Sequence, residues 1–105
     1  MEEPNFSYIN SLSGGDKAFE TKLLQIIQME YPKERDLYLK NISEGNFKEA
    51  AENVHKLKHK ISILGLEKSY EVASQFENNL KENKDILKED FSEILSSITR
   101  FLKKL

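Results

Sequence analysis

The sequence has no cysteine, and its 105 residues include only four glycines and two prolines. Without cysteine the chain has no disulfide framework, thiolate nucleophile or cysteine-ligated zinc site, as is common in a reducing compartment. So few turn-forming residues argue against a protein built from many strands. No apolar run approaches the roughly 18 residues needed to span a bilayer, and no signal peptide is apparent. These absences predict a cytoplasmic protein without direct membrane contact.

Charged residues make up 32% of the chain, but the two signs nearly cancel and leave a formal net charge of −2. A balanced charge gives no electrostatic reason to expect nucleic-acid binding. The apolar residues recur at helical spacing, which predicts a folded helical domain with a solvated surface rather than disorder. A chain of this length is predicted to form a single domain, residues 1–105, and a monomer is the default expectation.

The apolar spacing and its interruptions predict a short lead-in helix followed by further helical segments. Asp16, Asn46 and Asp85 are suitable N-caps for three of them, and Gly65 is suited to end one. Pro32 is expected to separate two segments at a kink, because proline is tolerated at the first position of a helix. The predicted segments are residues 5–12, 17–30, 32–44, 47–64, 67–82 and 86–104.

Short connections between these segments favour antiparallel neighbours. The predicted fold is therefore all-α: an up-down antiparallel four-helix bundle, in which the kinked pair 17–44 counts as one helix and the lead-in helix lies across the bundle. The clearest seam belongs to 47–64, where core residues alternate at steps of three and four. The residues expected in the core are Phe19, Leu23, Ile26, Ile27, Leu37, Tyr38, Leu39, Ile42, Phe47, Ala50, Val54, Leu57, Ile61, Leu64, Tyr70, Ala73, Phe76, Leu80, Leu87, Phe91, Ile94, Ile98, Phe101 and Leu105.

His55 stands beside this seam rather than in it. The neighbouring stripe consists of Ala51, His55, Lys58 and Ser62, each one position after a core residue and hence rotated by about 100°. An imidazole held at the rim of a rigid core is a usable nucleophile near neutral pH. Glu77 follows a core position on the next helix, so its carboxylate is predicted to accept a hydrogen bond from one ring nitrogen of His55. Lys58 is expected to neutralise part of the charge on a phosphoryl group carried by His55.

The same residues resemble the signature of histidine-containing phosphotransfer (HPt) domains. That signature reads His-x-Leu-Lys-Gly-x-x-x-x-Leu-Gly, followed about one helix later by a Leu-Glu pair. Breaks similar to the family's also fall in the upstream part, so the resemblance covers nearly the whole chain. The matching stretches are His55-Lys56-Leu57-Lys58-His59, Leu64-Gly65 and Phe76-Glu77, with upstream breaks at Gly14-Gly15-Asp16, Tyr31-Pro32 and Gly45-Asn46.

The resemblance implies a phosphocarrier rather than an enzyme. His55 would accept a phosphoryl group from the aspartate of one receiver domain and pass it to another, as an intermediate of two-component signal transduction. The family has no catalytic metal of its own, and the receiver brings the Mg²⁺. The implied partners are response-regulator receiver domains and a hybrid sensor histidine kinase. The chain is either a free-standing protein or the cytoplasmic end of such a kinase. The residues expected to dock a receiver are Ala51, Glu52, His59 and Ser62.

His59 departs from the signature, which usually has glycine at this position. Its bulk beside His55 keeps open an alternative function, a non-transferring module that docks receivers or other helices. A histidine on a helix surface is also often only solvated. His55, His59 and Glu52 could contribute to a zinc site, but Lys56 stands where the zinc-protease motif has glutamate and the nearby lysines disfavour a dication. No metal site is therefore predicted.

Overall fold

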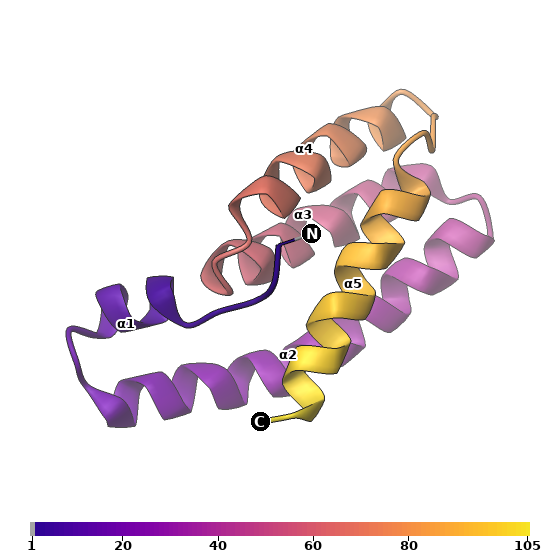
Figure 1. The fold of residues 1–105 in the computed structure, drawn as a ribbon. Coiled ribbons are helices and arrows are strands. Elements are labelled where there is room, and N and C mark those ends of the chain that lie inside the picture. Colours follow the sequence, from indigo (N-terminus) through magenta and orange to yellow (C-terminus); the bar gives the residue numbers. More distant parts are fainter. Residues whose placement is uncertain (1) are drawn as a thin grey trace.

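Five α-helices make up most of residues 2–105, the part of the chain that the computed structural model describes, and no strand occurs in this part. They are α1 (Ser7–Ser13), α2 (Lys17–Ser43), α3 (Phe47–Ile63), α4 (Glu67–Lys81) and α5 (Lys88–Lys103). The all-α prediction is confirmed at this level. α3 packs against both α2 and α4, α5 packs against α4, and α1 packs against α2 (Figure 1). None of the helices in the described part is long and apolar enough to cross a membrane.

α2 is one uninterrupted helix of 27 residues with Pro32 inside it, so the predicted division into two helices is wrong. Proline removes one backbone hydrogen bond from a helix interior. Contacts with α5 hold α2 on both sides of that position. The Tyr31 hydroxyl donates to a backbone carbonyl of α5 at 2.7 Å, and Nη1 of Arg35 donates to Oγ1 of Thr99 at 3.4 Å. These bonds favour continuity where the local sequence favours a break, and the kink itself stays a prediction.

The apolar seam of α3 lies at the centre of the core, as predicted. Val54, Leu57 and Ile61 are completely buried. Beside the seam, the ring of Tyr38 meets that of Phe91 edge-on at a centroid distance of 5.1 Å. Edge-to-face pairs of this kind favour one arrangement of the rings over others. The buried seam therefore fixes the position of α3 between α2 and α4. It also fixes the direction in which the neighbouring stripe of α3, which contains His55, points.

Several residues predicted for the core are exposed instead. On α2 the buried residues lie at steps of four and seven, which make a narrow face: Ile27, Tyr31, Tyr38 and Ile42. Neighbouring positions point about 100° away from it. A spacing count cannot choose between two adjacent apolar stripes, because both have helical period. The predicted core residues that are more than a third exposed are Phe19, Ile26, Leu37, Leu39, Tyr70 and Leu105.

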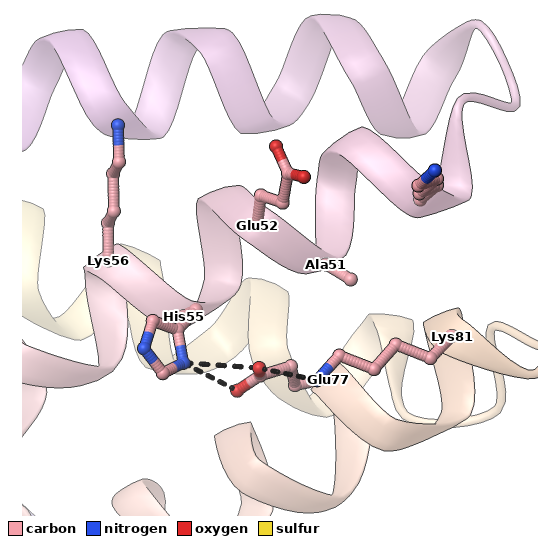
Figure 2. Close-up of a pocket in the computed structure, with 7 residues that line it drawn as sticks. Ala51, Glu52, His55, Lys56, Glu77 and Lys81 are labelled. Carbon is pink, nitrogen blue, oxygen red and sulfur yellow. Dashed lines mark hydrogen bonds and ion pairs between the residues drawn. The ribbon is translucent and has the colours of Figure 1, made fainter.

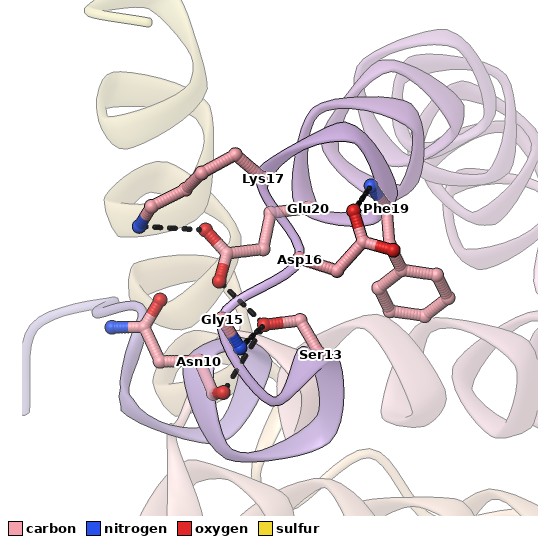
Figure 3. Close-up of polar contacts among 7 residues, drawn as sticks. All are labelled: Asn10, Ser13, Gly15, Asp16, Lys17, Phe19 and Glu20. Atoms are coloured by element: carbon pink, nitrogen blue, oxygen red, sulfur yellow. Dashed lines mark hydrogen bonds and ion pairs between the residues drawn. The ribbon is translucent and has the colours of Figure 1, made fainter.

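One of the three predicted N-caps is present. Oδ1 of Asp16 accepts a hydrogen bond from the Phe19 backbone N–H at 3.1 Å, in the turn between α1 and α2 (Figure 3). Asn46 occupies the N-cap position of α3 but makes no capping hydrogen bond, and the prediction for Asp85 is wrong. The side-chain amide of Asn46 donates to Glu44 and leaves the start of α3 without a side-chain cap. α5 begins at residue 88, so Asp85 lies in the preceding turn and does not cap it.

The chain before α1 lies across the turn between α3 and α4. The backbone N–H of Asn5 donates to the Leu64 carbonyl at 2.9 Å. The Glu2 carboxylate accepts from the backbone N–H groups of Lys68 at 3.0 Å and Ser69 at 2.8 Å. These groups belong to the first turn of α4, which has no cap from its own N-cap residue. Partial burial acts to raise the pKa of Glu2, but these hydrogen bonds outweigh it and lower the pKa.

Candidate functional site

His55 projects from α3 toward α4 with its side chain about half exposed (Figure 2). Its Nδ1 atom lies 3.1 Å from Oε2 and 3.4 Å from Oε1 of Glu77 on α4. An ionised carboxylate only accepts hydrogen bonds, so this contact requires Nδ1 to carry a proton. The other ring nitrogen, Nε2, then holds a lone pair in the neutral ring and points away from Glu77. The arrangement therefore fixes one tautomer and presents a nucleophilic nitrogen to solvent.

Glu77 is the organising group of the site. Its side chain is only 7% exposed, and its two oxygens are shared among three donors. Oε1 lies 3.0 Å from Nζ of Lys58, and Oε2 lies 3.2 Å from Nζ of Lys81. Burial acts to raise the pKa of Glu77, but the hydrogen bonds from Lys58, Lys81 and His55 together lower it. The carboxylate is therefore ionised at neutral pH and carries its charge next to the imidazole.

Lys58, one turn after His55 on α3, also contacts Glu77. Its side chain is 13% exposed, and its ammonium group also stands 5.3 Å from the centre of the Tyr70 ring. Two anchors of this kind hold the ammonium in place. In this structure the charge of Lys58 is directed to the carboxylate rather than free beside the ring. Its predicted action on a phosphoryl group stays a prediction, and its observed contact is with Glu77.

Lys81 also belongs to the site, although it is not among the residues predicted from the sequence. It stands one helical turn after Glu77, and its side chain is 60% exposed. The signal was available, because a glutamate followed by a lysine four residues later is a stabilising helix pair. Such a pair by itself indicates only helix stability, and it is the position of Glu77 beside His55 that makes Lys81 part of the site. Lys81 is the more accessible of the two cations that contact the carboxylate.

A groove of about 750 Å³ runs along the α3–α4 seam at His55. Ala51 lies one turn before His55 and is buried, so its methyl group leaves open space beside the ring. Charged side chains surround this space, three of them lysines. The lining residues are Lys48, Ala51, Glu52, His55, Lys56, Glu77 and Lys81. The groove thus combines one exposed imidazole with three lysines and two glutamates, and this excess of lysines suits an anionic group brought to the ring.

The four predicted docking residues lie in different places. Ala51 and Glu52 line the groove. His59 is exposed one turn after His55, and the two rings meet edge to face at a centroid distance of 5.3 Å and an angle of 88°. Ser62 is exposed farther along α3. His59 therefore stands directly beside the ring whose free nitrogen faces solvent.

No group of three or more histidine, cysteine or carboxylate side chains comes together in a metal-binding arrangement within residues 2–105. Glu52, the third ligand considered with His55 and His59, lies among the groove residues and in no such group. The chemistry that this site can perform with its own groups is nucleophilic attack by Nε2, with charge compensation by Glu77 and the lysines.

Searches of protein-family models, of curated proteins and of solved structures each found no match to this chain.

Proposed function

We propose that this protein is a phosphorelay intermediate of two-component signal transduction, an HPt-type carrier whose His55 accepts a phosphoryl group from a receiver aspartate and passes it to another receiver. The observation that carries the proposal is the contact of His55 Nδ1 with the buried carboxylate of Glu77 at 3.1 Å. It supplies what a phosphoryl-accepting imidazole needs: a fixed tautomer, an exposed Nε2 and a fixed counter-charge. The resemblance of the surrounding sequence to HPt domains supports the same function.

The transfer step uses only groups already described. The Nε2 lone pair attacks the phosphorus of the receiver's aspartyl phosphate. A nitrogen–phosphorus bond forms while the bond from phosphorus to the aspartate oxygen breaks, and the aspartate leaves as a carboxylate. Nδ1 keeps its proton, so the phosphorylated ring carries a positive charge that Glu77 stabilises. Onward transfer is the reverse reaction with a second receiver, whose aspartate takes the phosphoryl group and returns the electron pair to Nε2.

In this proposal the partner supplies the rest of the active site. The receiver brings the Mg²⁺, and this chain acts as a phosphocarrier rather than as an enzyme. The receiver docks on the α3–α4 groove, where Ala51 leaves room beside the ring and Glu52 lies in the lining, and it extends along α3 to His59 and Ser62. The helices are proposed to form an up-down four-helix bundle in a cytoplasmic monomer, which works alone or as the end of a hybrid sensor kinase.

The decisive experiment is phosphoryl transfer from labelled receivers. A set of receiver domains is phosphorylated with a small labelled acyl phosphate in the presence of Mg²⁺, freed of that reagent, and mixed with this protein. The expected product is a label on the protein that is stable in base and labile in acid, as a nitrogen–phosphorus bond requires. His55→Gln should abolish the label, whereas His59→Gln should retain it. Failure of every receiver to label His55 would refute the relay function.

His59 favours one alternative, a module that docks receivers without taking the phosphoryl group. Its ring lies edge to face against His55 and so occupies space next to the proposed nucleophile. The same experiment separates the two functions. Receiver binding by calorimetry without any label on His55 would support the docking module, and labelled His55 would exclude it.

A further inference from the structure

The chain contains only two arginines, and both line one groove, which shares no lining residue with the groove at His55. The groove lies between α2 and α5, encloses about 360 Å³, and receives Arg35 from α2 and Arg100 from α5. Arginine differs from lysine in presenting a planar fork of donors that matches carboxylate and phosphate oxygens. In a protein whose other cations are lysines, the placement of both arginines in one groove points to the recognition of an anion.

Arg35 is held in position by its surroundings. Its guanidinium lies 5.7 Å from the centre of the Tyr31 ring, and its Nη1 donates to Oγ1 of Thr99 at 3.4 Å. Thr99 in turn lies 3.0 Å from the Tyr31 hydroxyl, which is anchored on the Leu95 carbonyl. Only about a quarter of the Arg35 side chain is exposed. An arginine held in this way loses little conformational freedom when it binds a ligand.

The remaining polar groups of the groove are hydroxyls on α5. Ser92, Ser96 and Thr99 follow one another at steps of four and three, so they lie along one face of the helix. Two leucines, Leu39 and Leu95, provide the apolar part of the lining. Although the chain has 18 acidic residues, none of them is among the residues that line this groove. The lining of the groove therefore offers two guanidinium groups and three hydroxyl groups, and it contains no carboxylate.

A second groove continues the same seam and shares Arg35 and Thr99 with the first. It adds Lys103 and again has no acidic residue in its lining. The α2–α5 seam thus carries a third cationic side chain beside the arginine pair. Extended positive seams without acidic lining attract multiply charged anions more strongly than single carboxylates.

We propose that the α2–α5 groove is a binding site for a phosphate monoester, with Arg35 and Arg100 clamping the phosphate and the α5 hydroxyls donating to its remaining oxygens. The two arginines balance the double negative charge of the monoester, and Leu39 and Leu95 contact the organic part that carries it. The site uses none of the groups around His55, so it stands independently of the phosphorelay function.

Asp36 is not among the lining residues, but its carboxylate contacts Arg35. Its Oδ1 accepts from Nε of Arg35 at 3.0 Å and from Nη2 at 2.9 Å, while two thirds of its side chain is exposed. Exposed ion pairs contribute little to stability. A dianion held by two arginines should therefore displace Asp36, and removal of its charge should strengthen binding.

The test is a titration with O-phosphoserine followed by amide chemical shifts, with serine as the ligand that lacks the phosphate. Saturable shifts are expected at Ser96, Thr99 and Arg100. Arg100→Gln should weaken binding roughly tenfold, the effect of losing one charge-assisted bond. Asp36→Asn should strengthen it. Inorganic phosphate, titrated in parallel, shows whether the anion alone suffices or the organic part adds affinity.

Lys104→Gln is the matched control, because it removes one exposed positive charge just beyond the end of α5 and outside the groove lining. It should leave the affinity nearly unchanged. Equal weakening by Lys104→Gln and Arg100→Gln would mean that diffuse charge alone attracts the anion, and would overturn the proposal. Unsaturable shifts, or shifts confined to the lysines of the α3–α4 groove, would overturn it as well. An unchanged melting temperature of Arg100→Gln ensures that lost binding is not lost folding.

Discussion

Nδ1 of His55 lies 3.1 Å from Oε2 of Glu77, although the imidazole is half exposed and the carboxylate is almost completely buried. The two residues come from different helices and are separated by 22 positions in the chain. A buried carboxylate held also by Lys58 and Lys81 cannot turn away to solvent. The imidazole is therefore oriented by a group that is itself fixed, as in other sites where a third group orients a catalytic base.

Replacement of this carboxylate is the most direct mutational test of the relay proposal. Glu77→Gln keeps the shape of the side chain but removes the charge that balances a phosphorylated His55. We expect phosphorylation by a receiver to slow by about tenfold, or phospho-His55 to lose its label correspondingly faster, from the loss of one charge-assisted hydrogen bond. Glu67→Gln, on the first turn of the same helix, is the control. Equal transfer kinetics in the two variants would show that Glu77 does not orient the ring.

The lowered pKa of Glu77 also predicts how stability depends on pH. Because the folded state holds this pKa below its usual value of 4.5, the ionised carboxylate contributes stability above that pH. The contribution is lost as the pH falls from 4.5 through the folded-state pKa. The free energy of unfolding of the wild type should exceed that of Glu77→Gln by roughly 1–2 kcal/mol at about pH 7. By about pH 3 the difference should shrink. Denaturant titrations at both pH values measure it, and a constant difference would contradict the ion-pair assignment.

The sequence was sufficient to predict the parts of the fold that one helix determines alone. The seam of α3 stood out because its core residues repeat over the full length of the helix. His55 and Glu77 each follow a core residue on neighbouring helices, and this spacing predicts that their side chains face each other. Both inferences depend only on helical period and a short connection, so they needed no knowledge of distant contacts.

Other features depend on contacts between segments that are distant in the sequence, and local sequence patterns cannot predict such contacts. α2 passes through Pro32 while Tyr31 and Arg35 bind α5 on either side of it. Glu2 caps α4 from 66 positions away, which no local capping pattern predicts. The prediction that Phe19, Ile26 and Leu37 are buried is wrong for a related reason. α2 has two apolar stripes, and only tertiary packing decides which one is buried.

His59 provides a test of how closely a receiver approaches the ring. If the His59 ring obstructs the receiver, His59→Gly and His59→Ala should both speed transfer to His55. Ala preserves the helix, whereas Gly in a helix interior costs about 1 kcal/mol of stability. A gain with Gly alone would therefore point to helix flexibility rather than to removal of the ring. Slower transfer in both variants would mean that the His59 ring assists docking, as measured by rapid-quench kinetics with a fixed receiver.

Gly65 is expected to be intolerant of a side chain for two separable reasons. Its φ of +77° is unfavourable for other residues, and an added Cβ would lie 2.5 Å from Oδ1 of Asn5. Gly45 has a similar φ of +74° but open space around the Cβ position. Gly45→Ala should therefore cost about 1 kcal/mol, and Gly65→Ala more than that. Thermal unfolding measures both, and equal losses would show that Asn5 moves aside without cost.

The cap that Glu2 places on α4 predicts a second pH-dependent contribution, at the opposite end of the helix from Lys81. Glu2→Gln retains an acceptor oxygen but loses the charge that faces the first N–H groups of α4. We expect the variant to lose about 1 kcal/mol of stability at neutral pH, comparable to the loss of a side-chain N-cap.

Because the pKa of Glu2 is lowered in the folded state, this loss should diminish as the pH falls below 4.5. Amide hydrogen exchange localises the effect: protection should fall first at Lys68 and Ser69, whose N–H groups bind the Glu2 carboxylate. Glu3→Gln, one residue further on and without such a contact in the described structure, is the control. Equal exchange at these two amides in both variants would contradict the cap.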